Sequence, residues 1–454
     1  MRHDNLTEII RVCRAQLRAI SPVSISGCIV SVSGLVVQIA GLAGQVFIGD
    51  QLLLHGRDGA LVRAEVAGFR DGLAQALPFG GLDGLGPGQT VTLLPRAAGS
   101  IAVSDGWLGR VVDPLGRAMD GKGPVSTGAL PRPIVAAPPE ATGRARLGAR
   151  INLGVRALDL FTTCRVGQRL GLFSGSGVGK STLFAMLARA ADCDVAVIAL
   201  VGERGREVRE FLEDDLGREG LARAVVVVAT SDVPPVLRRR AAYTAMTVAE
   251  HFRDQGKSVL FMMDSVTRFC LAAREIGLSA GEPPSTRGYP PSVFAELPRL
   301  LERAGPGEDK DEGETGFITA LFTVLVEGDD PNEPVADAVR GILDGHVLLD
   351  RRIAEAGRYP PMDVLRSLSR AAQGCLTEEE MMLTRRARGI LALQGEMSDL
   401  VRMGAYRNGA DPAVDEALTL GPRIEALLHQ DRSEQTDQDA AFQMLREILT
   451  SGSA

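Results

Sequence analysis

Residues 169–190, RLGLFSGSGVGKSTLFAMLARA, decide the fold. An apolar run suited to a buried strand leads into a loop with three glycines, and a stretch suited to a helix follows. A strand, a glycine-rich turn and a helix in this order form the context that a phosphate-binding loop requires. The backbone N–H groups of such a loop face an anion, and the N-terminus of the following helix adds a favourable dipole. The sequence therefore predicts a P-loop nucleotide site.

The loop gives its residues separate roles. Lys180 is expected to reach the β- and γ-phosphates, and Ser181 is expected to offer its hydroxyl to Mg²⁺. Ser174 stands where the motif usually has its first glycine, a position at which a small residue suffices. A chance glycine-rich turn is the competing interpretation, and the flanking strand and helix argue against it. The predicted nucleotide-binding residues of the loop are Ser174, Gly175, Ser176, Gly177, Val178, Gly179, Lys180, Ser181 and Thr182.

A second apolar run, VLFMMD at residues 259–264, ends in an aspartate. In P-loop proteins, an aspartate in this position holds Mg²⁺, usually through water. Taken alone, Asp264 would be better explained as an ordinary strand-end residue that caps a turn. Paired with the phosphate loop, it is predicted to be the Walker B carboxylate and a metal ligand.

Two further charged residues are ambiguous from local sequence. Glu203 follows the apolar run 194–201, and ligands gather at the carboxyl ends of parallel strands. A carboxylate there can polarise the water that attacks a γ-phosphate. The run ERGRE at residues 203–207 nevertheless looks like any solvated loop, which is the better local interpretation. Arg370, at the end of YPPMDVLRSLSR, looks by itself like a surface salt-bridge partner.

The chain is predicted to have four parts. Residues 1–22 form an amphipathic helix that either packs on its own domain or binds a partner. Residues 23–95 contain short β-rich runs between glycine turns and predict a small β-barrel. Residues 96–372 hold a connector and then alternating strands and helices, and residues 373–454 contain no convincing strand. The fold class is therefore α/β: a RecA-like P-loop NTPase domain with an N-terminal β-barrel and a C-terminal helical domain. Buried strands are expected at 169–174, 194–201, 223–230, 257–263 and 316–326.

Composition excludes several classes of protein. The net charge is −7 and there is no basic patch interleaved with aromatics, which argues against a nucleic-acid partner. The six cysteines and five histidines show no metal-ligand spacing, so reduced thiols and no zinc site are expected. No secretory signal is present, and no apolar run approaches the ~20 residues needed to span a bilayer. We expect a soluble cytoplasmic protein that can still dock onto a membrane machine.

The chain resembles the catalytic subunits of rotary ATP synthases and, much more closely, the ATPases of type III protein export. The resemblance covers roughly residues 20–430. The runs that carry it are GERGREVREFLEDDLGREGLARAVVVVATSD (202–232), HFRDQGKSVLFMMDSVTRF (251–269), REIGLSAGEPPSTRGYPPSVFAELPRLLERAG (274–305), FTVLVEGDDPNEPVADAVRGILDGH (322–346) and GAYRNGADPAVDEA (404–417).

The resemblance implies roles that local sequence leaves open. It makes Glu203 the general base that orients the attacking water, and it places Arg204 and Arg268 near the γ-phosphate. It implies that Tyr359 stacks on adenine and that Arg370 is an arginine finger acting on the nucleotide of the adjacent subunit. Because such a finger makes catalysis depend on a neighbour, we expect a homohexameric ring.

The implied function is hydrolysis of ATP, with Mg²⁺, to energise flagellar protein export by releasing cargo from chaperones and unfolding it. The implied partners are a stator-like protein at the N-terminal helix, stalk-like proteins, the export gate, chaperones and cargo, at the cytoplasmic side of the inner membrane. Alternatives are an injectisome ATPase, a rotary ATP synthase subunit, a non-catalytic scaffold subunit and a hexameric RNA helicase. The stretch ADPAVDEA is less acidic than its rotary counterpart, and the carboxylate of Glu203 argues against a non-catalytic subunit.

Overall fold

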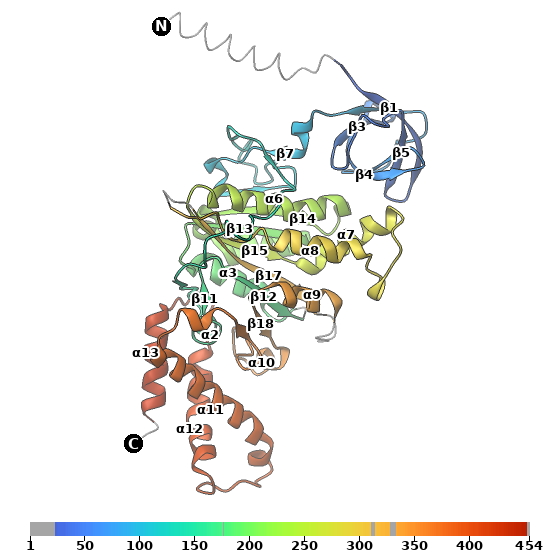
Figure 1. Cartoon of the computed structure of the whole chain (residues 1–454). Coiled ribbons are helices and arrows are strands. Elements are labelled where there is room, and N and C mark those ends of the chain that lie inside the picture. The colour runs from blue at the N-terminus through green and yellow to red at the C-terminus, as the bar shows by residue number, and fades with distance from the viewer. Residues whose placement is uncertain (1–22, 176, 310–313, 327–332, 452–454) are drawn as a thin grey trace, which may run out of the picture. The chain divides into compact units, whose positions relative to one another are not determined.

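The computed structural model describes residues 23–175, 177–309, 314–326 and 333–451, and it forms two compact units (Figure 1). One unit contains the chain up to Ile101 together with Ile276–Glu282, and the other contains Ala102–Glu275 and the chain from Pro283 onward. The helix predicted at residues 1–22 lies outside the described residues. Among the helices that the structure describes, none combines the length and the apolar character that a membrane-spanning segment requires.

The first unit is a closed β-barrel with strand order β1-β2-β5-β4-β3-β6, which confirms the predicted barrel. The barrel closes because β1 pairs with both β2 and β6, antiparallel in each case. Its interior is aliphatic, with Ile29, Val37, Leu52 and Val66 all buried. The strands are β1 (Ser26–Ser33), β2 (Val36–Ala40), β3 (Gln51–His55), β4 (Leu61–Arg70), β5 (Leu73–Pro78) and β6 (Thr90–Leu93).

The second unit is built on a nine-stranded sheet with the order β19-β18-β12-β17-β15-β13-β14-β8, and β16 pairs beside β17. The strands from β18 to β8 run parallel to one another. The strands are β8 (Arg110–Val112), β12 (Arg169–Ser174), β13 (Val195–Glu203), β14 (Ala224–Thr230), β15 (Ser258–Asp264), β16 (Gly305–Pro306), β17 (Phe317–Leu325), β18 (Gly345–Leu349) and β19 (Leu368–Ser369).

Helices cover both faces of this sheet, so its central strands are apolar on both sides. Helix α3 (Lys180–Ala190) packs on one face, where Phe184 joins the same buried cluster as Ile198 of β13. Helix α6 (Pro235–Arg253) contacts β13, β14 and β15 on the other face (Figure 1). Further helices of this unit are α4 (Gly205–Glu210), α5 (Gly217–Ala222), α7 (Val266–Ser279), α8 (Pro291–Leu301), α9 (Pro334–Ile342) and α10 (Arg351–Glu355).

A buried ion pair joins α6 to the segment after α8. Arg303 is fully buried and donates to both carboxylate oxygens of Glu250, at 2.8 and 2.6 Å. It also donates to the carbonyl of Ile134 at 2.7 Å. Removing one partner of such a pair leaves an uncompensated charge in the interior, which is strongly destabilising.

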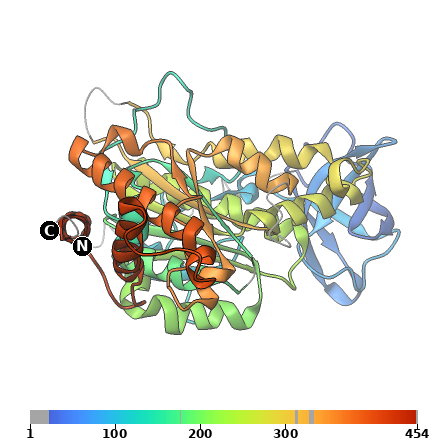
Figure 2. The same cartoon turned by 90° about the horizontal axis from the view of Figure 1, so that it is seen from below.

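The C-terminal part is helical, as predicted, and consists of α11 (Glu378–Arg402), α12 (Pro412–Leu428) and α13 (Gln438–Thr450). These helices, orange to dark red in Figures 1 and 2, lie together at one side of the sheet domain. They share its core, because Leu420 and Phe442 belong to the same cluster as Leu158 of helix α2 (Arg156–Phe161). Helix α11 begins with a capping box between Thr377 and Glu380.

All five predicted central strands are present, with small shifts at their ends. Strand β18 was not expected, because it has only five residues and its apolar part, VLL at residues 347–349, is too short to stand out in the sequence. Strand β8 was also missed, since three residues are too few to give a pattern. Both strands lie toward the margins of the sheet.

Candidate active site

The predicted phosphate loop connects β12 to α3. The strand ends at Ser174 and the helix begins at Lys180. Gly177 and Gly179 have φ values of 75° and 92°, a conformation that only glycine adopts at little cost. Val178 is buried and anchors the loop. The backbone therefore makes the tight reversal that brings successive N–H groups toward one point.

Ser176, one of the predicted loop residues, lies outside the described residues. Ser181 and Thr182 occupy the first turn of α3, with Ser181 exposed and Thr182 partly buried. Gly175 is buried directly after Ser174. The other predicted loop residues therefore line the turn between strand and helix.

The ammonium of Lys180 lies between two carboxylates. Its Nζ is 2.5 Å from Oδ1 of Asp264 and 3.8 Å from Oε1 of Glu203. The two acids come from neighbouring parallel strands, since β13 pairs with β15 and Leu200 lies in register with Asp264. The structure thus brings together three residues that sequence analysis predicted for the same site.

Thr323 of β17 also belongs to this cluster. Its hydroxyl donates to Oδ1 of Asp264 at 2.9 Å, and the Thr323 side chain is fully buried. Sequence analysis missed this residue. The available signal was a hydroxyl inside the apolar run ITALFTVLV (318–326), close to the end of the strand that points to the site.

The environment of Glu203 raises its pKa to about 7. Burial of the carboxyl group is the main cause, repulsion from Asp264 adds to it, and the nearby Lys180 ammonium opposes it. Oε1 of Glu203 is buried and has no hydrogen-bond partner among the described residues. A carboxylate that titrates near neutral pH, with an oxygen free to accept a proton, suits a general base.

The same residues fit a divalent cation. Ser181, Glu203 and Asp264 border one small cavity, to which Glu207 also contributes. A carboxylate and a hydroxyl supply the oxygen ligands that Mg²⁺ prefers. The carboxylate of Asp264 already faces a positive charge, that of Lys180, so its orientation suits a cation beside the phosphate loop.

The three predicted arginines lie in different surroundings. The stem of Arg268 packs against Gly202, where an added Cβ would come within 2.9 Å of its own Cβ. Arg268 therefore lies next to the peptide that precedes Glu203. The side chain of Arg204 is 78% exposed and pairs at 3.2 Å with Glu207, which borders the same small cavity as Glu203.

Arg370 lies away from this cluster, directly after β19. Its side chain is exposed and donates to the carbonyl of Arg340 at 3.5 Å. Strand β19 is the last strand at one margin of the sheet. The structure therefore leaves Arg370 outside the group formed by Lys180, Glu203 and Asp264.

The ring of Tyr359 lies beside the phosphate loop. A Cβ added to Gly179 would be 3.7 Å from Cδ1 and Cε1 of Tyr359. Tyr359 is 46% exposed, so much of its surface is open to a ligand. This placement suits an aromatic that stacks on a nucleotide base next to the phosphates.

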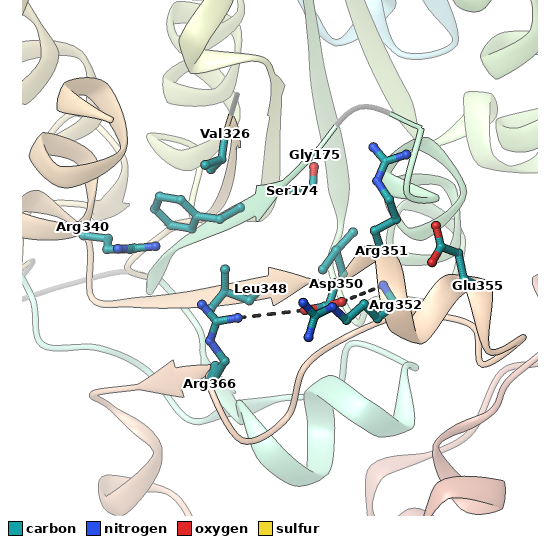
Figure 3. Close-up of a pocket in the computed structure, with 12 residues that line it drawn as sticks. Ser174, Gly175, Val326, Arg340, Leu348, Asp350, Arg351, Arg352, Glu355 and Arg366 are labelled. Atoms are coloured by element: carbon teal, nitrogen blue, oxygen red, sulfur yellow. Dashed lines mark hydrogen bonds and ion pairs between the residues drawn. The ribbon is translucent and has the colours of Figure 1, made fainter. Parts of the chain in front are cut away.

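A basic cavity of about 400 Å³ begins where the phosphate loop leaves β12 (Figure 3). Ser174 and Gly175 line it on one side, and Asp350 pairs with Arg366 at 3.9 Å on another. Sequence analysis did not single out its arginines, since nothing local distinguishes them. They are Arg340, Arg351, Arg352 and Arg366. Their charge favours anions near the start of the loop.

Comparison with family models divides the chain as the fold does. The nucleotide-binding domain of the ATP synthase alpha/beta family matches residues 154–369, and the beta-barrel domain of that family matches residues 29–94. The C-terminal domain of the type III secretion ATPase EscN matches residues 376–447.

Individual relatives cover most of the chain. A flagellum-specific ATP synthase of Caulobacter vibrioides is 54% identical over 389 residues, which are 86% of this chain and 87% of the relative. A type 3 secretion system ATPase of Xanthomonas euvesicatoria is 49% identical over 408 residues, 90% of each chain. The assembled ATPase EscN of enteropathogenic E. coli superposes with a TM-score of 0.85 at 38% identity, covering 93% of this chain and 100% of EscN. EscN in complex with its central stalk EscO gives a TM-score of 0.84 over the same shares.

Proposed function

The chain belongs to the ATP synthase alpha/beta family and within it to the ATPases of type III protein export, and we propose that it hydrolyses ATP to energise flagellar export. One observation carries the chemistry. Lys180, Glu203 and Asp264 converge from a phosphate loop and two neighbouring strands of a parallel sheet. This arrangement provides a group for the phosphates, a base for water and a carboxylate for a cation.

The residues act mainly by positioning and by stabilising charge. The loop amides and Lys180 bind the β- and γ-phosphates, and Lys180 exchanges its carboxylate partner Asp264 for phosphate oxygens. Glu203 orients a water and accepts its proton. Ser181 and Asp264 would hold Mg²⁺, which would supply positive charge beside the phosphates.

Arg268 is proposed to stabilise the γ-phosphate from its place beside Gly202. Arg204 reaches the γ-phosphate only after it leaves Glu207, because it now faces solvent. Tyr359 stacks on the adenine base.

Arg370 acts on the nucleotide of an adjacent subunit. Its exposed position at the sheet margin, outside its own phosphate site, supports this role. A group supplied by a neighbour requires assembly, and the likeness to assembled EscN supports a closed ring, which we propose contains six identical chains. An arginine finger of this kind contributes about 10³–10⁵ in rate.

The partners follow from the family. The complex of EscN with its central stalk EscO supports a stalk-like partner, and we further propose that residues 1–22 bind a stator-like regulator. The predicted boundaries at 23–95, 96–372 and 373–454 separate barrel, ATPase and helical parts. We place the ring in the cytoplasm, at the inner-membrane export gate, where it receives chaperones and cargo.

Service of an injectisome is the second candidate, because a type 3 secretion system ATPase is 49% identical. The flagellar assignment is favoured by the 54% identity to the Caulobacter relative. Motility of a flagellar ATPase deletion strain that expresses this chain separates the two. Restored swimming supports the flagellar role, and a non-motile strain with normal amounts of the protein contradicts it.

A mixing experiment tests the shared site. Glu203→Gln and Arg370→Ala should each lose turnover by orders of magnitude as pure rings. Mixed rings should regain activity, because an Arg370→Ala chain keeps Glu203 and receives Arg370 from a Glu203→Gln neighbour. No recovery, under conditions in which labelled chains are shown to co-assemble, would refute the assignment of Arg370 to the neighbouring site. Because the site is completed by a neighbouring subunit, the specific ATPase activity of the wild type should also rise with protein concentration.

A further inference from the structure

The main chain of Tyr359 is held at both of its polar groups by the segment that follows α12. Its N–H donates to Nδ1 of His429 at 3.3 Å, and its carbonyl accepts from the N–H of Gln430 at 2.7 Å. His429 and Gln430 are consecutive residues at the end of the α11–α12 hairpin. His429 and Gln430 of the helical part therefore hydrogen-bond both backbone groups of Tyr359, the residue that carries the aromatic ring.

The segment that contains His429 and Gln430 is itself held by buried hydrogen bonds. The Gln430 side chain is buried, accepts from the N–H of Arg156 at 2.9 Å and donates to the carbonyl of Gly154 at 2.8 Å. The Arg156 guanidinium donates to the carbonyls of Leu427 and His429, at 2.8 and 2.6 Å. Because these bonds tie it to the start of α2, the segment offers Tyr359 a fixed support.

A second contact binds the same loop to the hairpin. Nε of Arg358 lies 2.7 Å from Oε2 of Glu425 in α12. The other guanidinium nitrogens of Arg358 donate to the carbonyls of Pro360 and Met362, at 3.3 and 2.7 Å. Arg358 thus stiffens the loop and links it to α12 one residue before Tyr359.

The position of the Tyr359 ring depends on this backbone. Tyr359 is nearly half exposed, so the packing around it restrains its ring less than it would restrain a fully buried one. Its distance from Gly179 of the phosphate loop depends on where the peptide of Tyr359 lies, because that backbone carries the ring. Movement of the end of α12 would therefore move the ring relative to the phosphates.

We propose that His429 and Gln430 are positioning residues that set the affinity for the base of the nucleotide and couple it to the α11–α12 hairpin. The inference rests on the proposed stacking role of Tyr359. Nδ1 must be unprotonated to accept from an N–H, which places the ring proton of a neutral His429 on Nε2. A displacement of the hairpin would act on the base and leave the phosphate contacts of Lys180 unchanged.

The test compares His429→Leu, which lacks an acceptor, with His429→Asn, whose Oδ1 is bonded to Cγ as Nδ1 is in histidine. The full-length assembled protein is assayed for kcat and KM with ATP. Inorganic tripolyphosphate, which has phosphates but no base, is measured as a competitive inhibitor. His429→Leu should raise KM for ATP about threefold to tenfold, the effect of one hydrogen bond. Its kcat and its inhibition by tripolyphosphate should not change, and His429→Asn should restore most of the lost affinity.

His251→Leu is the matched control. This histidine lies at the end of α6, where its Nε2 is 3.0 Å from Nε2 of Gln255, and it should leave KM unaffected. Equal weakening of ATP and tripolyphosphate in His429→Leu, or an unchanged KM, would overturn the proposal. If His429→Leu does not fold, His429→Ala is judged by the same outcomes.

Tyr359→Ala separates this inference from the proposed function. If KM for ATP rises in Tyr359→Ala but stays normal in His429→Leu, Tyr359 stacks on the base and His429 does not position it. An unchanged KM in Tyr359→Ala refutes the stacking role, and the positioning role of His429 and Gln430 is refuted with it.

Discussion

Replacing Thr323 with valine should weaken binding of the metal–nucleotide complex while leaving metal-free nucleotide binding nearly unchanged. The substitution keeps the shape of the side chain and removes only the hydroxyl that donates to Asp264 at 2.9 Å. In the structure Asp264 Oδ1 has two donors, Thr323 and Lys180. When Lys180 turns to the phosphates, the hydroxyl of Thr323 remains to orient the carboxylate.

The magnitude follows from the charge on the acceptor. A hydrogen bond to a charged group is worth about 1.5–3 kcal/mol, and 1.4 kcal/mol is a factor of ten in affinity. Part of the loss is recovered when the carboxylate relaxes. Partners of metal ligands typically contribute 10–100-fold, so the dissociation constant of Mg–ADP should rise about 10-fold to 100-fold.

The assay is fluorescence titration of a labelled ADP, with Mg²⁺ and with a chelator. Thr319→Val is the matched control, because Thr319 is also buried in β17 and its hydroxyl accepts from the N–H of Gly167 at 2.9 Å, toward the other end of the strand. Both variants lose one hydroxyl, and only Thr323→Val should change the ratio of the two dissociation constants. If both variants shift that ratio equally, or neither does, Asp264 is not oriented by Thr323.

Further predictions concern Glu203, the contact between Gly202 and Arg268, and the buried ion pair of Arg303 and Glu250. Because burial raises the pKa of Glu203 to about 7, kcat/KM should rise as the pH increases through about 7 and level off above it; a flat profile would contradict its role as base. Gly202→Ala should displace Arg268 and lower kcat at least tenfold, with the fold intact by circular dichroism. The reason is that Gly202 has a φ of 75° and that a Cβ there would lie 2.9 Å from the Cβ of Arg268. Normal turnover would exclude a catalytic role of Arg268 that depends on this contact. Arg303→Met should lower the free energy of unfolding in guanidinium chloride by about 3–5 kcal/mol, since Glu250 stays buried without its partner, and Arg303→Met/Glu250→Leu should recover most of it. Failure of the double variant to recover would mean that Arg303 stabilises the fold by other contacts.

The convergence of Lys180 and Asp264 could be predicted from local patterns and one general rule, whereas the local sequence around Glu203 favoured a solvated loop and only the family resemblance gave that residue a role. Lys180 follows a glycine-rich loop, and Glu203 and Asp264 each end an apolar run. Parallel strands bring their carboxyl ends to the same edge of a sheet, so these residues meet. The same reasoning did not separate Arg204 from Glu203. Successive residues of an extended chain point to opposite sides, which is why Glu203 faces the site and Arg204 faces solvent.

Other parts of the site depend on contacts that no local pattern carries. Tyr359 and His429 are 70 residues apart, and their bond requires the whole α11–α12 hairpin to return to the sheet domain. Thr323 is a single hydroxyl in an apolar strand, and only the strand order shows that it reaches Asp264. The arginines of the basic cavity come from α9, α10 and the segment before β19, which lie together only after folding.

The strand order divides the large sheet into central strands, which are bonded on both sides, and marginal strands, which are bonded on one side only. The strands that end in Ser174, Glu203 and Asp264 each have a bonded strand on both sides. Strand β19, which ends just before Arg370, has two residues and a single neighbour. A marginal strand of this kind opens more easily than a strand bonded on both sides, and its amides should exchange with solvent sooner. Arg370 therefore follows a part of the sheet that yields easily, whereas the phosphate loop and the two carboxylates are held by strands that are bonded on both sides.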